Sequence, residues 1–409
     1  MLFVTSTSKA PSAKILREDF AIRASDELAE QAGTAPRTRL PASHNRSARF
    51  VWYADSAALT LVGGQQERSE VDTALAVGLA NQGDRELRLV LPKGWHEPTL
   101  HRWAWLRDDL ALDVWAHNGG DATPEKRPAR LQSENLMRGE EDPQLHLRDR
   151  TGWVEDLMRW AGGQQDLDAS HRRDVRAWQC RGQRVLRIKR KGAGLEVLAG
   201  IDWGAGSPQQ SPAPMLLTGP LTSEQERSAR EQVQVGMHQR LSGVARKADE
   251  NWLQAVLRRH PRRLGLEQPV LREVAAWRPS GSEGTKQSIS RGRGFVDLVG
   301  LDSTGTLLLV ETKLGSDQML VLQGLDYRIW AEANRDRLTQ RLDCRTDVPM
   351  EISYCVGGKN GGTPAWSAYA QAQLAALSPD LRWHAQEVAG WTGDDLRARR
   401  GELRTYPVA

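Results

Sequence analysis

The chain has 409 residues, of which 39% are hydrophobic and 26% charged, and its formal net charge is +4. This length suits two or three domains of roughly 100–200 residues each. No stretch approaches the ~20 apolar residues that cross a bilayer, and the first residues lack the apolar core of a secretory signal, so we expect a cytoplasmic protein. Three scattered cysteines predict neither a disulfide framework nor a zinc site. The small positive charge permits a nucleic-acid partner without requiring one.

The N-terminal third predicts an arm followed by a small domain. Residues 1–47 have weak apolar periodicity and predict a flexible arm, with one short helix around Asp26–Ala32. Strand and helix patterns alternate over residues 48–118, which predicts a small α/β domain with a parallel sheet. The sequence LVGG at 61–64 lacks the complete phosphate-loop fingerprint. Because ligands bind at the ends of parallel strands, we expect this domain to sense a small-molecule or protein activator.

The middle of the chain predicts a linker and a basic sheet. Residues 119–150 are polar, and residues 151–220 read as a helix and a three-stranded β-meander. Between His171 and Lys191 lie nine Arg or Lys residues and one Asp, with Trp178 among them. Such a surface could grip phosphates while the indole stacks on a base. The alternative is a solvated strand face whose charges pair with acids elsewhere.

Residues 221–409 predict a further domain in the order helix, helix, strand, strand, strand, helix, strand, helix, strand. Ser223 and Glu226 fit a capping box at the start of its first helix. Residues 295–314 read FVDLVGLDSTGTLLLVETKL, two apolar runs joined by a short turn, which predicts a β-hairpin. If Asp302 pairs with Thr306, Gly305 takes a left-handed turn position.

That register places Asp297 opposite Glu311, while strand alternation puts Lys313 on the same face as Glu311. Both runs are apolar on both faces, so we expect buried central strands. Burying charge is costly unless the charge is paired or holds a metal. Two carboxylates could bind Mg²⁺ (or Mn²⁺), and the lysine could orient or help to deprotonate an attacking water. The alternative is a structural ion pair.

The flanking helices supply further candidates. Glu250 borders the apolar stripe of the preceding helix and could reach the metal, with Asp249 as the second choice. Gln323 and Tyr327 lie four residues apart on the following helix and so share a face. They could position a water or a phosphate oxygen, or form a boundary pair satisfied within the fold.

Two arginines precede the hairpin aspartate. Arg291 and Arg293 alternate with glycines, and their guanidinium groups could hold a phosphate by bidentate contacts. We therefore expect them to bind substrate.

Taken together, these residues resemble the PD-(D/E)XK nuclease superfamily, whose core runs helix, three strands, helix, strand. The RecB-like branch adds a Q-x-x-x-Y element. Val296 stands where the family motif has proline. The matching residues are Asp297, Glu311, Lys313, Glu250, Gln323 and Tyr327.

The resemblance implies a restriction-endonuclease-like α/β core, a mixed sheet flanked by helices, in residues 221–409. It also implies a hydrolase that cuts phosphodiester bonds with Mg²⁺ or Mn²⁺, of DNA more often than RNA, in defence or repair. Asp297, Glu311 and Glu250 would hold the metal. Two alternatives stay open: a non-catalytic nucleic-acid-binding protein on this fold, and a ligand-gated effector nuclease. The sequence also leaves a homo-oligomer open.

Overall fold

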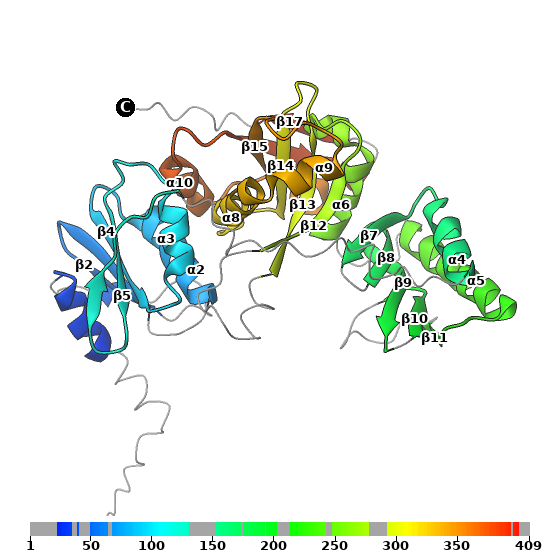
Figure 1. The fold of residues 1–409 in the computed structure, drawn as a ribbon, viewed down its shortest axis with the longest axis horizontal. Helices are drawn as coiled ribbons and strands as arrows, with labels where there is room; N and C mark the ends of the chain where they lie inside the picture. The colour runs from blue at the N-terminus through cyan, green and yellow to red at the C-terminus, as the bar shows by residue number, and fades with distance from the viewer. Residues whose placement is uncertain are drawn as a thin grey trace, which may run out of the picture. The chain divides into compact units, whose positions relative to one another are not determined.

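A computed structural model describes residues 23–34, 39–40, 50–63, 68–130, 152–172, 175–192, 194–202, 213–242, 248–277, 293–393 and 396–400. The protein is an α/β protein with sheets of six, five and six strands (Figure 1). It divides into two compact units. The first unit runs to Leu131 and also takes residues 371–379, while the second contains the five-stranded sheet and the last six-stranded sheet. Within the described part, no helix has the length and apolar character needed to cross a membrane.

The first unit has a sheet whose spatial order follows the chain. Its three central strands pair in parallel, as predicted, and the edge pairs are antiparallel. The strands are β1 (Arg39–Leu40), β2 (Phe50–Ala54), β3 (Ala58–Gly63), β4 (Glu86–Pro92), β5 (Leu112–His117) and β6 (Ala122–Pro124). Helix α2 (Arg68–Asn81) follows β3, and α3 (Glu97–Trp103) follows β4.

The first unit extends beyond residues 48–118 on both sides. Within the expected arm, residues 23–31 are helical, and Leu28 packs in one buried cluster with Tyr53 of the sheet. Within the expected linker, β6 pairs with β5. From the C-terminal part of the chain, Leu377 forms a β-bridge with Leu106. The limits of this unit therefore depend on packing between segments far apart in sequence.

The five-stranded sheet belongs to the second unit and is antiparallel throughout. Its strands are β7 (Asp168–Arg172), β8 (Val175–Cys180), β9 (Gln183–Lys191), β10 (Gly194–Ala199) and β11 (Met215–Thr218). Strands β8 to β10 are the predicted meander, and β7 and β11 extend it. Helices α4 (Gly152–Gly162) and α5 (Ser223–Leu241) pack with it. We call these seven elements the meander layer.

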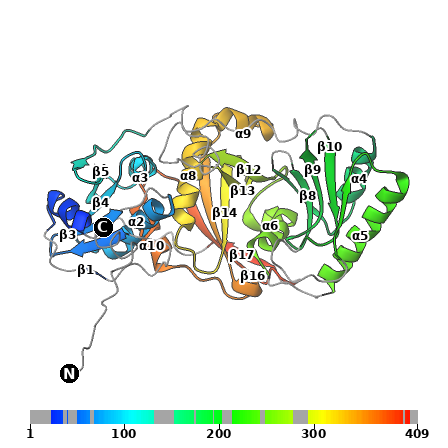
Figure 2. The same cartoon turned by 90° about the horizontal axis from the view of Figure 1, so that it is seen from below.

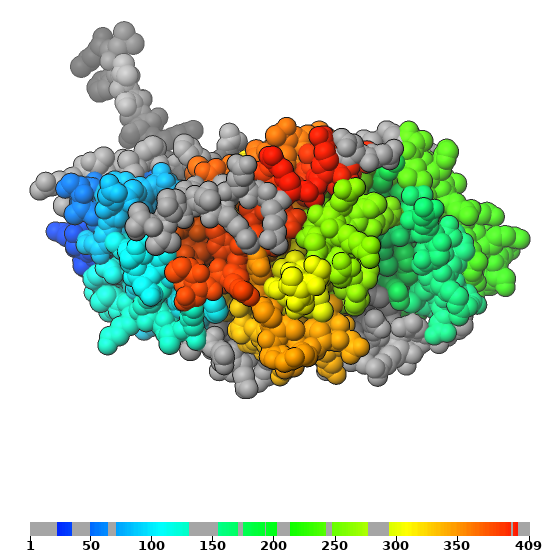
Figure 3. Space-filling view, turned by 90° about the horizontal axis from the view of Figure 1, so that it is seen from above, coloured from blue at the N-terminus to red at the C-terminus, as the bar shows by residue number. Residues whose placement is uncertain are grey.

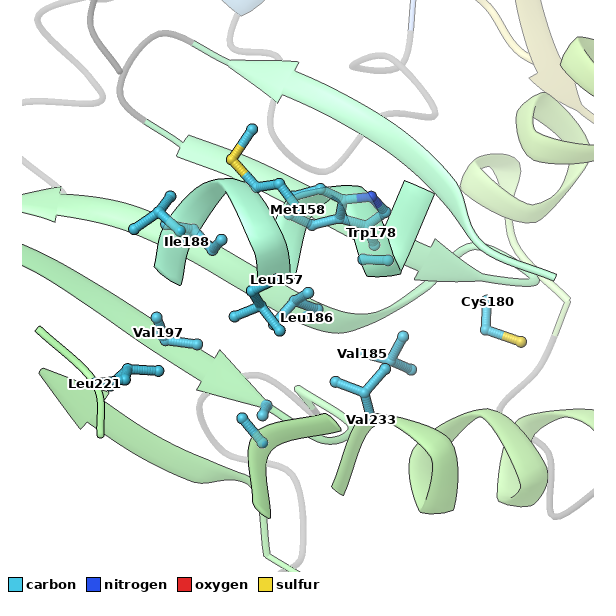
Figure 4. Packing of buried hydrophobic residues seen from close by; sticks show 14 of the residues in the cluster. Leu157, Met158, Trp178, Cys180, Val185, Leu186, Ile188, Val197, Leu221 and Val233 are labelled. Carbon is cyan, nitrogen blue, oxygen red and sulfur yellow. The ribbon is translucent and has the colours of Figure 1, made fainter. Parts of the chain in front are cut away.

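The core of the meander layer contains Trp178 together with Leu157 of α4 and Val233 of α5 (Figure 4). Trp178 is only 1% exposed, so the prediction that its indole stacks on a nucleic-acid base is wrong. Helix α5 packs here, so the predicted boundary at residue 220 falls inside this layer. Its capping box is formed by Thr222 and Gln225, one residue earlier than predicted.

The third sheet is mixed, as predicted, with the order β12-β13-β14-β15-β16-β17. Pairs β14–β15 and β15–β16 are parallel and the others antiparallel. The strands are β12 (Leu271–Trp277), β13 (Arg293–Leu301), β14 (Leu307–Leu314), β15 (Met350–Gly357), β16 (Trp383–Ala389) and β17 (Arg397–Arg400). The helices are α6 (Glu250–Arg259), α8 (Leu320–Ala333) and α9 (Arg335–Arg341); α10 (Ala368–Ala376) lies between β15 and β16 in sequence, and its residues from 371 onward belong to the first unit. The predicted element order is confirmed, with α9 and β17 in addition.

Helices α6 and α8 cover opposite faces of this sheet (Figure 2). Leu253 of α6 packs with Leu298 and Val310 on one face. On the other face, the Tyr354 hydroxyl donates to the Val321 carbonyl of α8 at 3.2 Å. In the face drawn in Figure 3, yellow residues of the β13–β14 region form only a small patch between lime and orange segments. Burial on both faces explains why most residues of both hairpin strands are apolar.

Candidate active site

The hairpin between β13 and β14 has the predicted register. Asp302 N–H donates to the Thr306 carbonyl at 2.9 Å, and Gly305 has a φ of +80°. Strand pairs run from Leu301–Leu307 to Leu298–Val310. The next pair in this register is Asp297 with Glu311.

The regular ladder between β13 and β14 stops at that pair. Instead of a strand carbonyl, the Asp297 carboxylate accepts the Thr312 N–H and the Thr312 hydroxyl, each at 2.7 Å. Strand β14 continues to pair with β15, where Glu311 lies beside Tyr354. The two hairpin strands therefore part at their carboxylates, and a side chain fills the gap in the sheet.

Lys313 links two carboxylates from different elements. Its Nζ donates to Glu311 Oε1 at 2.9 Å and to Glu250 Oε1 at 3.1 Å. Glu311 is 1% exposed, whereas the Glu250 side chain is 37% exposed. The structure thus brings the hairpin residues and the helix glutamate together, with Glu250 on the solvent side.

The charges of this cluster are not balanced. Burial raises the pKa of Glu311 well above its ordinary value, and the Asp297 charge raises it further. Burial also raises the pKa values of Asp297 and Glu250. Burial alone would lower the pKa of Lys313, but the charges of Glu311, Asp297 and Glu250 outweigh it and raise that pKa. Three carboxyl groups surround the Lys313 ammonium, and the Arg272 guanidinium of β12 also acts on Asp297; a further cation would offset the burial that raises the pKa values of these carboxyl groups.

One carboxylate oxygen in the cluster has no partner. Glu311 Oε2 is buried and accepts no hydrogen bond. A buried acceptor of this kind costs free energy unless a donor or a cation reaches it. Among the described residues, however, no three carboxylate, histidine or cysteine side chains are grouped so as to hold a metal ion. Thr312 bonds only Oδ2 of Asp297 and Lys313 bonds only Oε1 of Glu311, so the other oxygen of each carboxylate is the one that a metal could reach.

The first turn of α6 separates the two acids that the sequence offered. Asp249 caps the helix, because its Oδ1 accepts the Trp252 N–H at 3.1 Å. Glu250 is left to contact Lys313. One turn later, Gln254 Nε2 donates to the Thr312 hydroxyl at 3.2 Å. Sequence reasoning missed Gln254, although its spacing of four from Glu250 puts both on one side of the helix.

Gln323 and Tyr327 hold the strand that carries Asp297. The Tyr327 hydroxyl accepts from Gln323 Nε2 at 3.1 Å and from the Phe295 N–H at 3.2 Å. Phe295 lies two residues before Asp297 on β13. The predicted shared helix face is therefore present, and this pair contacts the backbone next to the acid cluster.

Two further acids near the cluster were also missed. Glu273 falls opposite Asp297 in the β12–β13 register, between the Arg272–Leu298 and Val274–Val296 pairs. It is buried, its φ is +50°, and its charge contributes to raising the pKa of Asp297.

The second missed acid is Asp317, whose charge acts in the same direction on Glu250. The β12–β13 pairing that brings Glu273 to Asp297 joins segments separated in the sequence by residues 278–292, so no local pattern signals it.

The predicted substrate arginines are only partly described. Arg291 lies outside the described residues. Arg293 begins β13 and pairs with Trp277, but only its backbone is described. Their role in binding substrate stays a prediction.

The basic strand of the meander layer pairs its charges internally. Arg184 lies 2.9 Å from Asp202, Arg187 lies 3.1 Å from Glu196, and Lys191 lies 2.9 Å from Glu196. These ion pairs correspond to the second of the two interpretations of this segment, a solvated face with acidic partners.

In the first unit, the ends of the parallel strands are joined by a histidine. His117 at the end of β5 lies 2.6 Å from the Gly63 carbonyl at the end of β3, and its Nδ1 accepts the Gly119 N–H at 3.2 Å. Burial lowers the pKa of this imidazole. Both ring nitrogens are thus used within the fold, and the activator predicted for this unit stays a prediction.

Comparisons of the chain with protein-family models, with curated proteins and with solved structures found no match.

Proposed function

We propose that the chain is a metal-dependent nuclease of the PD-(D/E)XK type that hydrolyses phosphodiester bonds of DNA at the opening of the β13–β14 hairpin. The observation that carries the proposal is the buried, unpartnered Glu311 Oε2 in a cluster of three acids and one lysine. A structural ion pair would be expected to satisfy its own buried oxygens. A site that binds a divalent cation can leave such an oxygen without a hydrogen bond, because the cation is its partner.

Asp297 and Glu311 are the proposed ligands of Mg²⁺ or Mn²⁺, and Glu250 supports them from the exposed side. Carboxylate oxygens are the ligands that Mg²⁺ prefers. Bound there, the metal would supply positive charge beside the scissile phosphate and acidify a water molecule. The Thr312 hydroxyl and N–H fix the Asp297 carboxylate, which keeps its free oxygen in one orientation.

The remaining residues of the proposal act on water and phosphate. Lys313 Nζ can exchange one of its carboxylate bonds for an attacking water or a phosphate oxygen. Gln323 and Tyr327 keep β13 in place through Phe295 N–H. Arg291 and Arg293 are proposed to hold the phosphate backbone of the substrate.

The proposal is tested by cleavage of supercoiled, linear and single-stranded DNA and of RNA, each with Mg²⁺, Mn²⁺ or EDTA. We expect cutting of DNA that EDTA abolishes and that Asp297→Ala removes. The matched control is Asp156→Ala, which removes an exposed aspartate of α4 and should cut like the wild type. Metal-independent cutting, or full activity of Asp297→Ala, would contradict the site.

A non-catalytic nucleic-acid-binding role is the second candidate, and one observation favours it. The acids are engaged with Lys313 and Thr312, and among the described residues no metal-holding group of three is preformed. DNA binding without cutting under every condition would support this role. Cutting that appears only after addition of a nucleotide or cell extract would instead support a ligand-gated nuclease with an activator at the first unit.

A reducing compartment such as the cytoplasm is proposed as the setting. Cys180, Cys344 and Cys355 are all free thiols, and two of them are buried.

A further inference from the structure

Helix α6 carries two side chains that touch the hairpin, and both of its ends contact the meander layer. Glu250 bonds Lys313, and Gln254 bonds Thr312. Helix α6 has only 10 residues. A helix this short depends on tertiary contacts for its stability, so whatever holds α6 also holds Glu250.

The first turn of α6 lies against the β8–β9 turn. Arg181 and Arg240 place their guanidinium carbons 5.4 and 5.0 Å from the Trp252 ring centroid, within the range of a cation–π interaction. Arg240, 3% exposed at the end of α5, also donates to the Arg181 carbonyl at 2.7 Å. Trp252 lies two residues after Glu250. The two arginines therefore contact α6 about half a helical turn from the Glu250 carboxylate.

Gly182 makes the backbone contact at the same place. Its φ is +75°, and a Cβ at this position would overlap the backbone nitrogen of Trp252. The β8–β9 turn therefore approaches α6 as closely as only glycine permits.

The last turn of α6 is held by β7. Arg258 donates to the Ala169 carbonyl at 2.7 Å and lies 3.6 Å from Asp168. Asp168 is also ion-paired with Arg272 of β12, which donates to Gln179 of β8 at 3.3 Å. These groups are largely buried, and a buried charge left without its partner is strongly destabilising.

We infer that the meander layer is a clamp that positions α6, and through it Glu250, against Lys313. Gly182, Trp252 and Arg240 are positioning residues of this clamp. Loosening the clamp frees the first turn of α6 and removes Glu250 from the ammonium. The effect on cutting rests on the proposed function, whereas the effect on α6 does not.

The test compares two turn glycines of the same sheet in the full chain. Gly182→Ala and Gly192→Ala both place alanine at a positive φ, +75° and +60°, but a Cβ at Gly192 meets nothing within 4 Å. Strain is therefore matched, and only Gly182→Ala pushes on α6. Amide hydrogen exchange of residues 253–259 is the first measurement, and Mn²⁺ affinity is the second.

We expect Gly182→Ala to speed exchange in α6 and to weaken Mn²⁺ binding, each by about tenfold or more, with Gly192→Ala within about twofold of wild type. Arg240→Met should act like Gly182→Ala, and Arg240→Lys should recover part of the protection because it keeps a cation at Trp252. If Gly182→Ala does not fold, the comparison of Arg240→Met with Arg240→Lys decides whether the meander layer positions α6.

Equal exchange in the two glycine variants, or unchanged α6 protection in Arg240→Met, would overturn the clamp. If the wild type neither binds Mn²⁺ nor cuts DNA, the proposed function fails, and the exchange data still decide whether the clamp exists.

Discussion

The β13–β14 hairpin and the β9–β10 region of the meander layer both carry acids and bases on strands, yet they balance charge in different ways. On β9 and β10, Arg187 and Lys191 share Glu196 near the surface. At the hairpin, Lys313 faces three carboxyl groups under burial, and one oxygen of Glu311 has no partner. This difference is why we propose the hairpin, and not the more charge-dense β9–β10 region, as the functional site.

Removing a lysine should affect DNA cleavage most differently in the two regions. Lys313→Ala should lower DNA cleavage by about 10³-fold, because it removes the group that we propose to orient water and to stabilise developing charge. Lys191→Ala, which removes one lysine of the meander layer, should leave cleavage unchanged. Steady-state rates with Mg²⁺ check both variants. Wild-type activity in Lys313→Ala would show that the lysine serves only the fold.

The register of the hairpin was predictable because it depends on local turn chemistry. Asp302 and Gly305 fix the loop, and strand alternation then determines which side chains meet. The amphipathic pattern of α6 likewise indicated Glu250. The capping role of Asp249 also had a local signal, an aspartate directly before the first helical residue, although we expected it only as a second choice for the metal.

Features that depend on packing were missed. Trp178 belongs to a sequence segment rich in basic residues, but its own side chain faces the core made with α4 and α5. Gln254 and Glu273 lie at the candidate site because they contact or face residues far from them in the sequence, Thr312 and Asp297 respectively. The limits of the first unit depend on segments as distant as residues 371–379. Apart from the four-residue spacing of Glu250 and Gln254, none of these contacts leaves a periodic or turn signal in the sequence.

The next largest expected effect is a change in Mn²⁺ affinity when the hairpin lysine is replaced. Lys313→Met should bind Mn²⁺ about tenfold more tightly than wild type, because no ammonium then competes for Glu311 and Glu250, even though it cannot cut. Titration followed by electron paramagnetic resonance measures this. Lys359→Met, which changes an exposed lysine near Gly315, is the control and should not alter the affinity. Weaker binding in Lys313→Met would mean that the lysine builds the metal site instead of competing for it.

Stability distinguishes a site from a structural ion pair. Glu311→Gln should raise the free energy of unfolding in EDTA by about 1 kcal/mol, because it removes one charge from an over-acidic cluster while Lys313 keeps Glu250. Urea denaturation gives the value. A loss above about 3 kcal/mol would indicate instead that Glu311 and Lys313 are a structural pair.

The smallest effect is expected for DNA affinity after a substitution on β9 of the meander layer. Arg187→Gln should change DNA affinity by less than about twofold and leave the salt slope unaltered, because this guanidinium already pairs with Glu196. Its cost in stability should stay below about 1 kcal/mol. Fluorescence anisotropy at several salt concentrations provides the test. If the slope of log DNA affinity against log salt concentration decreases in magnitude by about one, Arg187 contacts a phosphate of the DNA.

The most direct measurement is Mn²⁺ binding to the wild type and to an Asp297→Asn, Glu311→Gln double variant, which keeps side-chain volume but removes both hairpin charges. We expect a Mn²⁺ site in the wild type that is lost in the double variant. Equal Mn²⁺ affinity of the two proteins would contradict it.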